Sequence, residues 1–258
     1  SLSECCEKLY NEVKQIASEI KILSQTAAHR NRMKCAGKGA CPYGGAFYFF
    51  LRMGINMCGI AGFCDFHADF TQDRDRWLGT LVAMREAVAH RGKDQNGEFL
   101  DRNVGFSHAR LSIRDLAGGI QPMARRAKGA DYVIVYNGEI YNTEELAPEL
   151  KRKGYVFHTT SDTEVILYSY IEYGPEFVSR LNGIFAFAIW DGRDRRLLLC
   201  RDRVGVKPLF YAVKNSTLVF ASEIKSLFQH PKITPRADMD SFREIFGIGP
   251  ARTPGCGV

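Results

Sequence analysis

The segment 184-IFAFAIWDGRDRRLLLCRDRVGVKPLFYAVKNSTLVFASE-223 holds four strand-like runs in close succession. Aliphatic and aromatic residues fill each run, and turn-forming residues such as Gly, Asp, Asn and Pro lie between them. Runs of this length and composition, bounded by turn residues, indicate β-strands. The expected strands are 184–191, 196–202, 209–215 and 217–223.

Upstream of this segment, helical and strand-like patterns alternate. Helices are predicted over 74–90, over 143–154, where Gly154 closes the helix, and over 161–174, which opens with a Ser/Asp cap and ends at Gly174. Strands are predicted over 58–63, 103–113 and 131–142, and an Asn-Gly turn is expected in the last of them. Strands in clusters, with helices between the clusters, indicate an α+β domain with largely antiparallel sheets.

The first 56 residues have a different texture. Residues 3–24 are predicted to form an amphipathic helix, because apolar residues recur there at spacings of three and four. These apolar residues are Leu9, Val13, Ile16, Ile20 and Leu23. Residues 34–46 are rich in Gly and small residues, which is typical of a flexible linker. Together they predict an N-terminal extension, 1–56, that is separate from the domain.

Charge and composition argue against several classes of function. Eight Lys/Arg against four Asp/Glu place +4 of the net +6 in residues 1–56, and no long basic run supports nucleic-acid binding. No apolar run approaches the roughly 20 residues that span a bilayer, so no membrane segment is expected and we predict a cytoplasmic protein. The eight cysteines show neither a disulfide framework nor the spacing of a metal site.

Cys58 is the first candidate for chemistry, although a lone cysteine in an apolar strand is usually only part of a core. It directly follows Met57, in "MCGI". If Met57 were an initiator and were removed, Cys58 would carry a free α-amine, with a reference pKa of roughly 7.7–8.0. An amine beside a thiol is a built-in general base, and inside a chain that nitrogen is an amide that cannot act as one.

Three further patterns suggest a site that recognises an amino acid. Asn137 and Gly138, in "YNGEIYN", would form a hairpin turn or, by converging their N–H groups, an oxyanion hole. Arg110, in "HARLSI", would form an ordinary salt bridge or hold a substrate carboxylate through two parallel bonds. Asp162, in "SDTEV", would cap a helix or bind a substrate ammonium.

These motifs occur in order between residues 57 and 211, and together they resemble the class II glutamine amidotransferase domain. Within that class they resemble the N-terminal half of glutamine-hydrolysing asparagine synthetase. The seven segments are "MCGIAGF", "AHRGKDQNGEF", "HARLSIRDLAGGIQPM", "YNGEIYN", "TSDTEVIL", "LNGIFAFAIWD" and "RDRVGVKPLFY". The resemblance implies a four-layer αββα N-terminal-nucleophile sandwich of two antiparallel sheets.

The resemblance also implies roles for individual residues. Cys58 matches the nucleophile that attacks the glutamine amide and forms a thioester, and Asn137 and Gly138 match the oxyanion hole. The expected glutamine contacts are Arg110 at the α-carboxylate, Asp162 and Glu139 at the α-amino end, and Leu111 and Ile113 in the pocket lining. The implied reaction releases glutamate and ammonia, and the ammonia is destined for ATP-dependent amidation of aspartate in a second domain.

The resemblance divides the chain into the extension, an amidotransferase domain over 57–235 and the start of a connection over 236–258. No pyrophosphate loop like "SGGLDS" occurs, so ATP and Mg are expected in a synthetase domain outside this chain, and no cofactor or metal within it. Expected partners are glutamine and that synthetase domain, with a homodimer left open. Lys93 stands where the family commonly has proline, and little consequence is expected from this loop position.

The extension leaves three alternatives open. Residues 1–56 are upstream translated sequence with Met57 as the start, or a propeptide removed by self-cleavage, or an attached segment. With Met57 bonded to Cys58 we expect no glutaminase activity, and the chain would be a non-catalytic module that binds glutamine or a partner. The other enzyme reading is a class II amidotransferase that passes ammonia to a sugar phosphate or phosphoribosyl acceptor.

Overall fold

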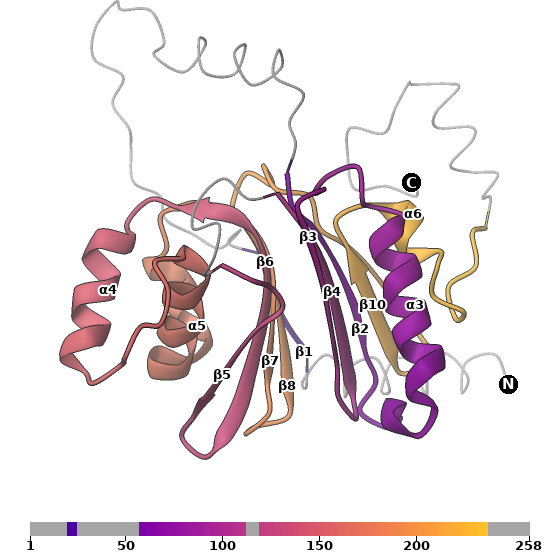
Figure 1. Ribbon diagram of the computed structural model, residues 1–258, viewed down its shortest axis with the longest axis horizontal. Coiled ribbons are helices and arrows are strands. Elements are labelled where there is room, and N and C mark those ends of the chain that lie inside the picture. Colours follow the sequence, from indigo (N-terminus) through magenta and orange to yellow (C-terminus); the bar gives the residue numbers. More distant parts are fainter. Residues whose placement is uncertain (1–19, 25–56, 112–118, 237–258) are drawn as a thin grey trace, which may run out of the picture.

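The computed structural model describes residues 20–24, 57–111 and 119–236 and contains two five-stranded sheets, which lie face to face (Figure 1). The first has the strand order β1–β8–β7–β6–β5, formed by Ile20–Ser24, Arg196–Arg201, Gly183–Asp191, Ala130–Ile140 and Met123–Ala127. The second has the order β3–β4–β2–β10–β9, formed by Gln95–Leu100, Val104–Arg110, Gly59–Cys64, Thr217–Ala221 and Phe210–Lys214.

Helices cover the outer face of each sheet. Helices α4 (Thr143–Arg152) and α5 (Asp162–Tyr173) lie against the first sheet, and α3 (Arg74–Glu86) with the short α6 (Ile224–Leu227) lies against the second. Two 3-10 turns complete the described elements, η1 (Phe70–Asp73) and η2 (Gly174–Arg180). The order helix, sheet, sheet, helix confirms the four-layer sandwich that the family resemblance implied.

Burial on both faces explains why the central strands are so apolar. In β6, Val133 and Val135 lie in the core between the sheets, whereas Ile134 and Tyr136 belong to the core beneath α4 and α5. Because successive side chains of a strand point to opposite faces, the odd-numbered residues of β6 face the second sheet. This alternation decides which residues near the end of β6 can meet residues of β2 and β4.

The predicted helix ends are confirmed in α5. Ser161 is its N-cap, and its Oγ accepts a hydrogen bond from the Thr163 N–H at 3.2 Å. Gly174 ends the helix with φ +67°, a conformation that glycine adopts at little cost. The sequence therefore specified this helix locally.

The Asn-Gly turn expected at 137–138 is wrong. Asn137 and Gly138 lie inside β6 and pair with Ala186 and Phe185 of β7 in an antiparallel register that runs from Tyr132 to Ile140. This long ladder keeps the backbone extended, and α4 and α5 supply the connection between the two strands. Tertiary pairing thus overrides the local turn preference.

The helix predicted over 3–24 is wrong for its last five residues. Ile20–Ser24 forms β1, which pairs in parallel with β8 from Leu197 to Arg201. Without β1, strand β8 would leave a row of N–H and C=O groups unpaired at the sheet edge. The isoleucines of β1 are β-branched, and β-branched residues favour strands. The rest of that helix and the linker over 34–46 lie outside the described residues.

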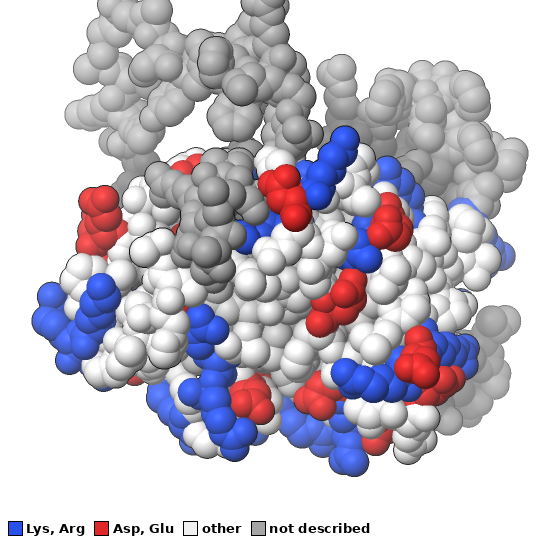
Figure 2. Space-filling view, viewed as in Figure 1, with Lys and Arg blue, Asp and Glu red and all other residues white. Residues whose placement is uncertain are grey.

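Two edge strands escaped the sequence analysis because they are polar. Strand β3 reads QNGEFL and β5 reads MARRA, and neither shows an apolar run. In the described part of the chain no helix is both long and apolar enough to cross a bilayer. On the face shown in Figure 2, acidic and basic side chains are interspersed, and no basic stripe crosses it.

Candidate functional site

Cys58 lies directly before β2, at the end where β2 meets β4. The register pairs Gly59 with Ala109, so Cys58 lies opposite Arg110 one step further along. The Leu111 N–H donates to Cys58 Sγ at 3.4 Å, and Arg91 Nε donates to the Cys58 carbonyl at 3.2 Å. These bonds fix both the thiol and the backbone of Cys58.

The surroundings of Cys58 are buried and carry positive charge. Burial raises the pKa of the Cys58 thiol, and the Leu111 backbone bond and the cations Arg110, Lys207 and Arg91 act in the opposite direction. Because the raised pKa holds the thiol protonated near neutral pH, a nucleophile here needs a base to take its proton. For Cys58 to act as a nucleophile, a base must therefore lie beside its Sγ.

Asn137 faces the same interior as Cys58. It is in phase with Val133 and Val135, whose side chains lie between the sheets, and only 2% of its surface is exposed. Among the described residues its Nδ2 has no hydrogen-bond partner. A buried amide donor without a partner is costly, so a ligand atom that accepts from it would be favoured.

Gly138 contributes a second donor through its backbone. The Tyr136 N–H donates to Gln121 Oε1 at 2.6 Å and the Ile140 N–H donates to Asp162 Oδ2 at 3.1 Å, so both point away from β7. Alternation along the strand directs the Gly138 N–H to the same edge. A Cβ at 138 would collide with the Ile184 carbonyl oxygen, which explains the glycine.

Arg110 is held from two sides. It is 5% exposed, and its Nη1 donates to Gln95 Oε1 of the neighbouring strand β3 at 2.8 Å. A Cβ built on Gly119 would lie 2.7 Å from Arg110 Nη2, so Gly119 leaves room for the guanidinium. Gln95 thus holds a buried guanidinium, a group whose planar fork matches the geometry of a carboxylate.

Asp162 is the first residue of α5, and the capping contact is made by its neighbour Ser161. Asp162 Oδ2 accepts from the Tyr136 hydroxyl at 2.7 Å and from the Ile140 N–H, so this carboxylate ties α5 to β6. Burial raises its pKa, partly opposed by these hydrogen bonds. The helix-cap alternative thus describes Ser161 and not Asp162.

Of the remaining predicted residues, the structure describes Glu139 and Leu111 but not Ile113. Glu139 lies in β6 opposite Ile184, and its charge acts on Tyr136 and Lys207. Leu111 contacts Cys58 through its backbone, whereas Ile113 lies outside the described residues. The structure therefore gathers Cys58, Arg110 and Leu111 at one strand end, and Asn137 to Glu139 with Asp162 on and beside β6.

Several residues that support the site were missed by the sequence analysis. These residues contact or make room for the predicted ones, but the sequence predicted no role for them. They are Arg91, Gln95, Gly119, Tyr136 and Lys207. The one signal in the sequence is that all five lie inside the seven segments that resemble the family. His108 also lies in the interior; its Nε2 is 3.1 Å from the Tyr136 carbonyl oxygen, and burial lowers its pKa to about 4.

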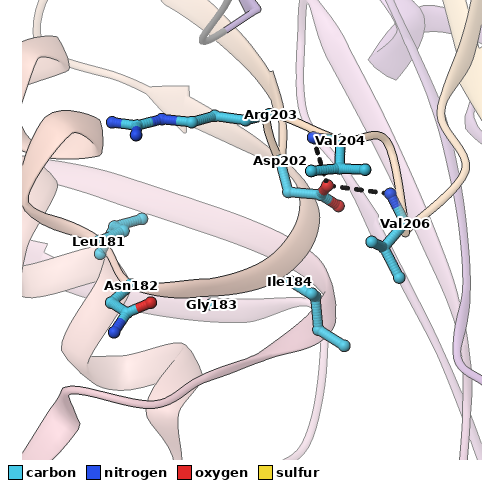
Figure 3. A pocket seen from close by; sticks show the side chains of 8 residues that line it. All are labelled: Leu181, Asn182, Gly183, Ile184, Asp202, Arg203, Val204 and Val206. Carbon is cyan, nitrogen blue, oxygen red and sulfur yellow. Dashed lines mark hydrogen bonds between the residues drawn. The ribbon is translucent and has the colours of Figure 1, made fainter. Parts of the chain in front are cut away.

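An open pocket of about 340 Å³ lies beside the turn that carries Lys207, and none of its lining residues was a predicted site residue (Figure 3). It is lined by Leu181, Asn182, Gly183, Ile184, Asp202, Arg203, Val204 and Val206.

Comparison with known proteins gives one family over most of the chain. Residues 57–257 match the family described as "Glutamine amidotransferase domain". The chain is 48% identical over 202 residues to asparagine synthetase [glutamine-hydrolyzing] 3 of Bacillus subtilis, covering 78% of this chain and 32% of that protein. It is 40% identical over 172 residues to asparagine synthetase B [glutamine-hydrolyzing] of Escherichia coli, covering 66% of this chain and 30% of that protein.

A solved structure shares the fold. The glutamine phosphoribosylpyrophosphate amidotransferase of Bacillus subtilis superposes with a TM-score of 0.54 at 20% identity, covering 66% of this chain and 42% of that one. The chain spans about a third of the length of the two curated relatives.

Proposed function

The chain belongs to the glutamine amidotransferase domain family, and from this premise we propose that it hydrolyses glutamine to glutamate and ammonia. One observation carries the proposal. Asn137 Nδ2, a buried amide donor that has no partner among the described residues, faces the interior that also receives the thiol of Cys58. This pairing of a nucleophile with an orphaned donor suits attack on a carbonyl carbon and stabilisation of the resulting oxyanion.

The chemistry requires Cys58 to be the first residue of the working chain. Its α-amine takes the thiol proton, and the thiolate attacks the side-chain amide carbon of glutamine. Asn137 Nδ2 and the Gly138 N–H stabilise the oxyanion of the tetrahedral intermediate. The α-amine returns the proton to the departing ammonia, and water then hydrolyses the γ-glutamyl thioester to glutamate and regenerates the thiol.

Recognition of glutamine falls to the charged groups around this centre. Arg110 binds the α-carboxylate, because its guanidinium is buried, positively charged and matched to a planar anion. Asp162 and Glu139 bind the α-ammonium, which would favour the ionised form of the Asp162 carboxylate against its burial. Leu111 and Ile113 line the space for the aliphatic part of the substrate.

The fate of the ammonia is the second part of the proposal. The relatives named above are asparagine synthetases, so we propose that a partner domain with ATP and Mg uses the ammonia to amidate aspartate in the cytoplasm. Edge strand β9 supports a partner on this molecule, because Phe210, Tyr211 and Val213 are exposed on it. Exposed apolar residues on an edge strand commonly mark an interface.

The test uses the full chain with a specific protease site placed directly before Cys58. After cleavage, glutamate release from glutamine is measured, with asparagine as the matched substrate control. We expect hydrolysis of glutamine, little hydrolysis of asparagine, and loss of activity in Cys58→Ala. An amino acid that binds to the cleaved chain without any glutamate release would favour a binding module instead.

A Cβ at position 119 provides a sharp test of carboxylate recognition. In Gly119→Ala the new methyl group would lie 2.7 Å from Arg110 Nη2 and displace the guanidinium. We expect the KM for glutamine to rise about tenfold or more with a smaller change in kcat, because the lost interaction is mainly one of substrate binding. The matched control is Gly79→Ala in α3, whose Cβ meets nothing within 4 Å. Equal KM values for the two variants would contradict this role of Arg110.

A further inference from the structure

We propose that Lys207 is a positioning residue for the N-terminal nucleophile: its ammonium lies beside Cys58, favours the neutral form of the amine and partly offsets the effect of burial on the thiol. This inference rests on the proposed function. Lys207 matched no role in the sequence analysis, and it lies in the "RDRVGVKPLFY" segment between β8 and β9.

The position of the Lys207 side chain is the first observation. Only 7% of this lysine is exposed, which is unusual for a lysine without a buried partner. Its Nζ donates to Met57 Sδ at 2.9 Å. Met57 is bonded to the Cys58 nitrogen, so the ammonium already contacts the residue whose removal creates the α-amine.

The turn that carries Lys207 is clamped in place. Asp202 accepts hydrogen bonds from the N–H groups of Val204 at 3.2 Å and Val206 at 2.9 Å (Figure 3), and from that of Lys207 at 2.9 Å. Arg201 closes the turn from the other side, with Nε donating to the Lys207 carbonyl at 2.9 Å. A backbone fixed at this many points directs the lysine side chain reproducibly.

The same turn is joined to the strand that pairs with the proposed oxyanion hole. Asp202 Oδ2 also accepts from the Phe185 N–H at 3.3 Å, and the Asp202 N–H donates to the Phe185 carbonyl at 2.7 Å. Phe185 lies opposite Gly138 in the register of β6 and β7. Lys207 is therefore held relative to both Cys58 and Gly138.

The charges that face this centre come from every neighbouring element. Arg110 of β4, Arg91 after α3 and Lys207 act on the Cys58 thiol. Burial lowers the pKa of Lys207 and Arg91 acts in the same direction, whereas Cys58, Glu139 and Asp202 act against them. Cys58 also interacts electrostatically with Tyr136. Glu223 forms an ion pair with Arg91 at 2.9 Å. Arg91 pairs with Glu223 and Arg110 donates to Gln95, whereas no carboxylate lies within ion-pair distance of Lys207 among the described residues.

The sign of the effect follows from elementary electrostatics. A cation near an amine disfavours the ammonium form and lowers the pKa of that amine. The same cation favours the thiolate and lowers the pKa of the thiol. Both effects extend activity to lower pH, because the reaction needs an unprotonated amine and an accessible thiolate.

The experiment compares Lys207→Met with Lys207→Arg in the full chain cleaved before Cys58. The pH profile of kcat/KM for glutamine is recorded, and the rate of Cys58 alkylation by iodoacetamide is followed as a readout that needs no turnover. In Lys207→Met we expect the acidic limb and the alkylation curve to move up by about one pH unit, since a single charge at close range has an effect of this order. In Lys207→Arg both curves should stay near those of the unsubstituted chain.

Two comparisons separate the outcomes. Lys214→Met removes an exposed lysine from β9, and it should leave both curves in place. A Lys207→Met chain that folds and titrates like the unsubstituted chain would overturn the inference while leaving the proposed function intact. Absence of glutamate release from the unsubstituted cleaved chain would instead overturn the proposed function, and the alkylation curves would still report on Lys207.

Discussion

The chain that keeps Met57 bonded to Cys58 is expected to hydrolyse glutamine at least about 10²–10⁴-fold more slowly than the chain that begins at Cys58. In the intact chain the Cys58 nitrogen is an amide and cannot accept the thiol proton. The buried imidazole of His108 is a poor substitute, because its Nε2 contacts the Tyr136 carbonyl and burial lowers its pKa to about 4. The raised pKa of the Cys58 thiol makes the missing base more costly still.

The measurement uses one preparation before and after cleavage, so that folding and concentration are matched. Intact mass defines the first residue in each sample, and glutamate release gives the two rates. Equal rates before and after cleavage would remove the α-amine from the mechanism. A rate that rises with the fraction of chains beginning at Cys58 is the expected result.

Asn137→Leu is expected to lower kcat by about 10²–10³-fold, the usual cost of removing one oxyanion donor. The structure adds a less obvious expectation. Since Asn137 Nδ2 has no partner among the described residues, its replacement by an apolar side chain of similar size should leave the free energy of unfolding equal or higher. Kinetics and denaturant unfolding of the same variant test both statements.

Asn103→Leu is the matched control for the stability statement. Asn103 Nδ2 donates to the carbonyls of Asp65, Phe66 and Ala68, at distances from 2.6 to 3.3 Å. Its replacement removes these three hydrogen bonds and the bond that Asn103 Oδ1 accepts from Arg195 Nη2, and should lower the free energy of unfolding by about 1–3 kcal/mol. If Asn137→Leu loses as much stability as Asn103→Leu, the amide of Asn137 is structural and the oxyanion assignment fails.

The fold was predictable where local signals and tertiary pairing agree. The four strands between 184 and 223 and helix α5 follow from apolar runs, turn residues and caps that lie within a few residues of each other. The Asn-Gly turn failed because β7 pairs along the whole end of β6, which no local signal at 137–138 reveals. Ile20–Ser24 failed for the same reason, since its partner β8 lies far along the chain.

The sequence suggested the candidate reactive residues of the site, but not the residues that hold them in position. A thiol after Met57, an Asn-Gly pair and an arginine in a strand each had a structural alternative, and it was their order along the seven family segments that joined them into one predicted site. Gln95, Gly119 and Lys207 act through long-range contacts with Arg110 or Met57, and such contacts leave no spacing in the sequence to detect. The sequence predicted a Ser/Asp cap without separating the two residues; the fold uses Ser161 as the cap, and Asp162 accepts from the Tyr136 hydroxyl.

The most direct test of Cys58 as an N-terminal nucleophile is to quench the cleaved chain in acid during turnover and map the adduct by mass spectrometry. The account predicts a γ-glutamyl thioester on the peptide that begins with Cys58, and none on the uncleaved chain. Glutamate release at the full rate with the acyl group on another residue, or an equal adduct on the chain that retains Met57, would contradict it.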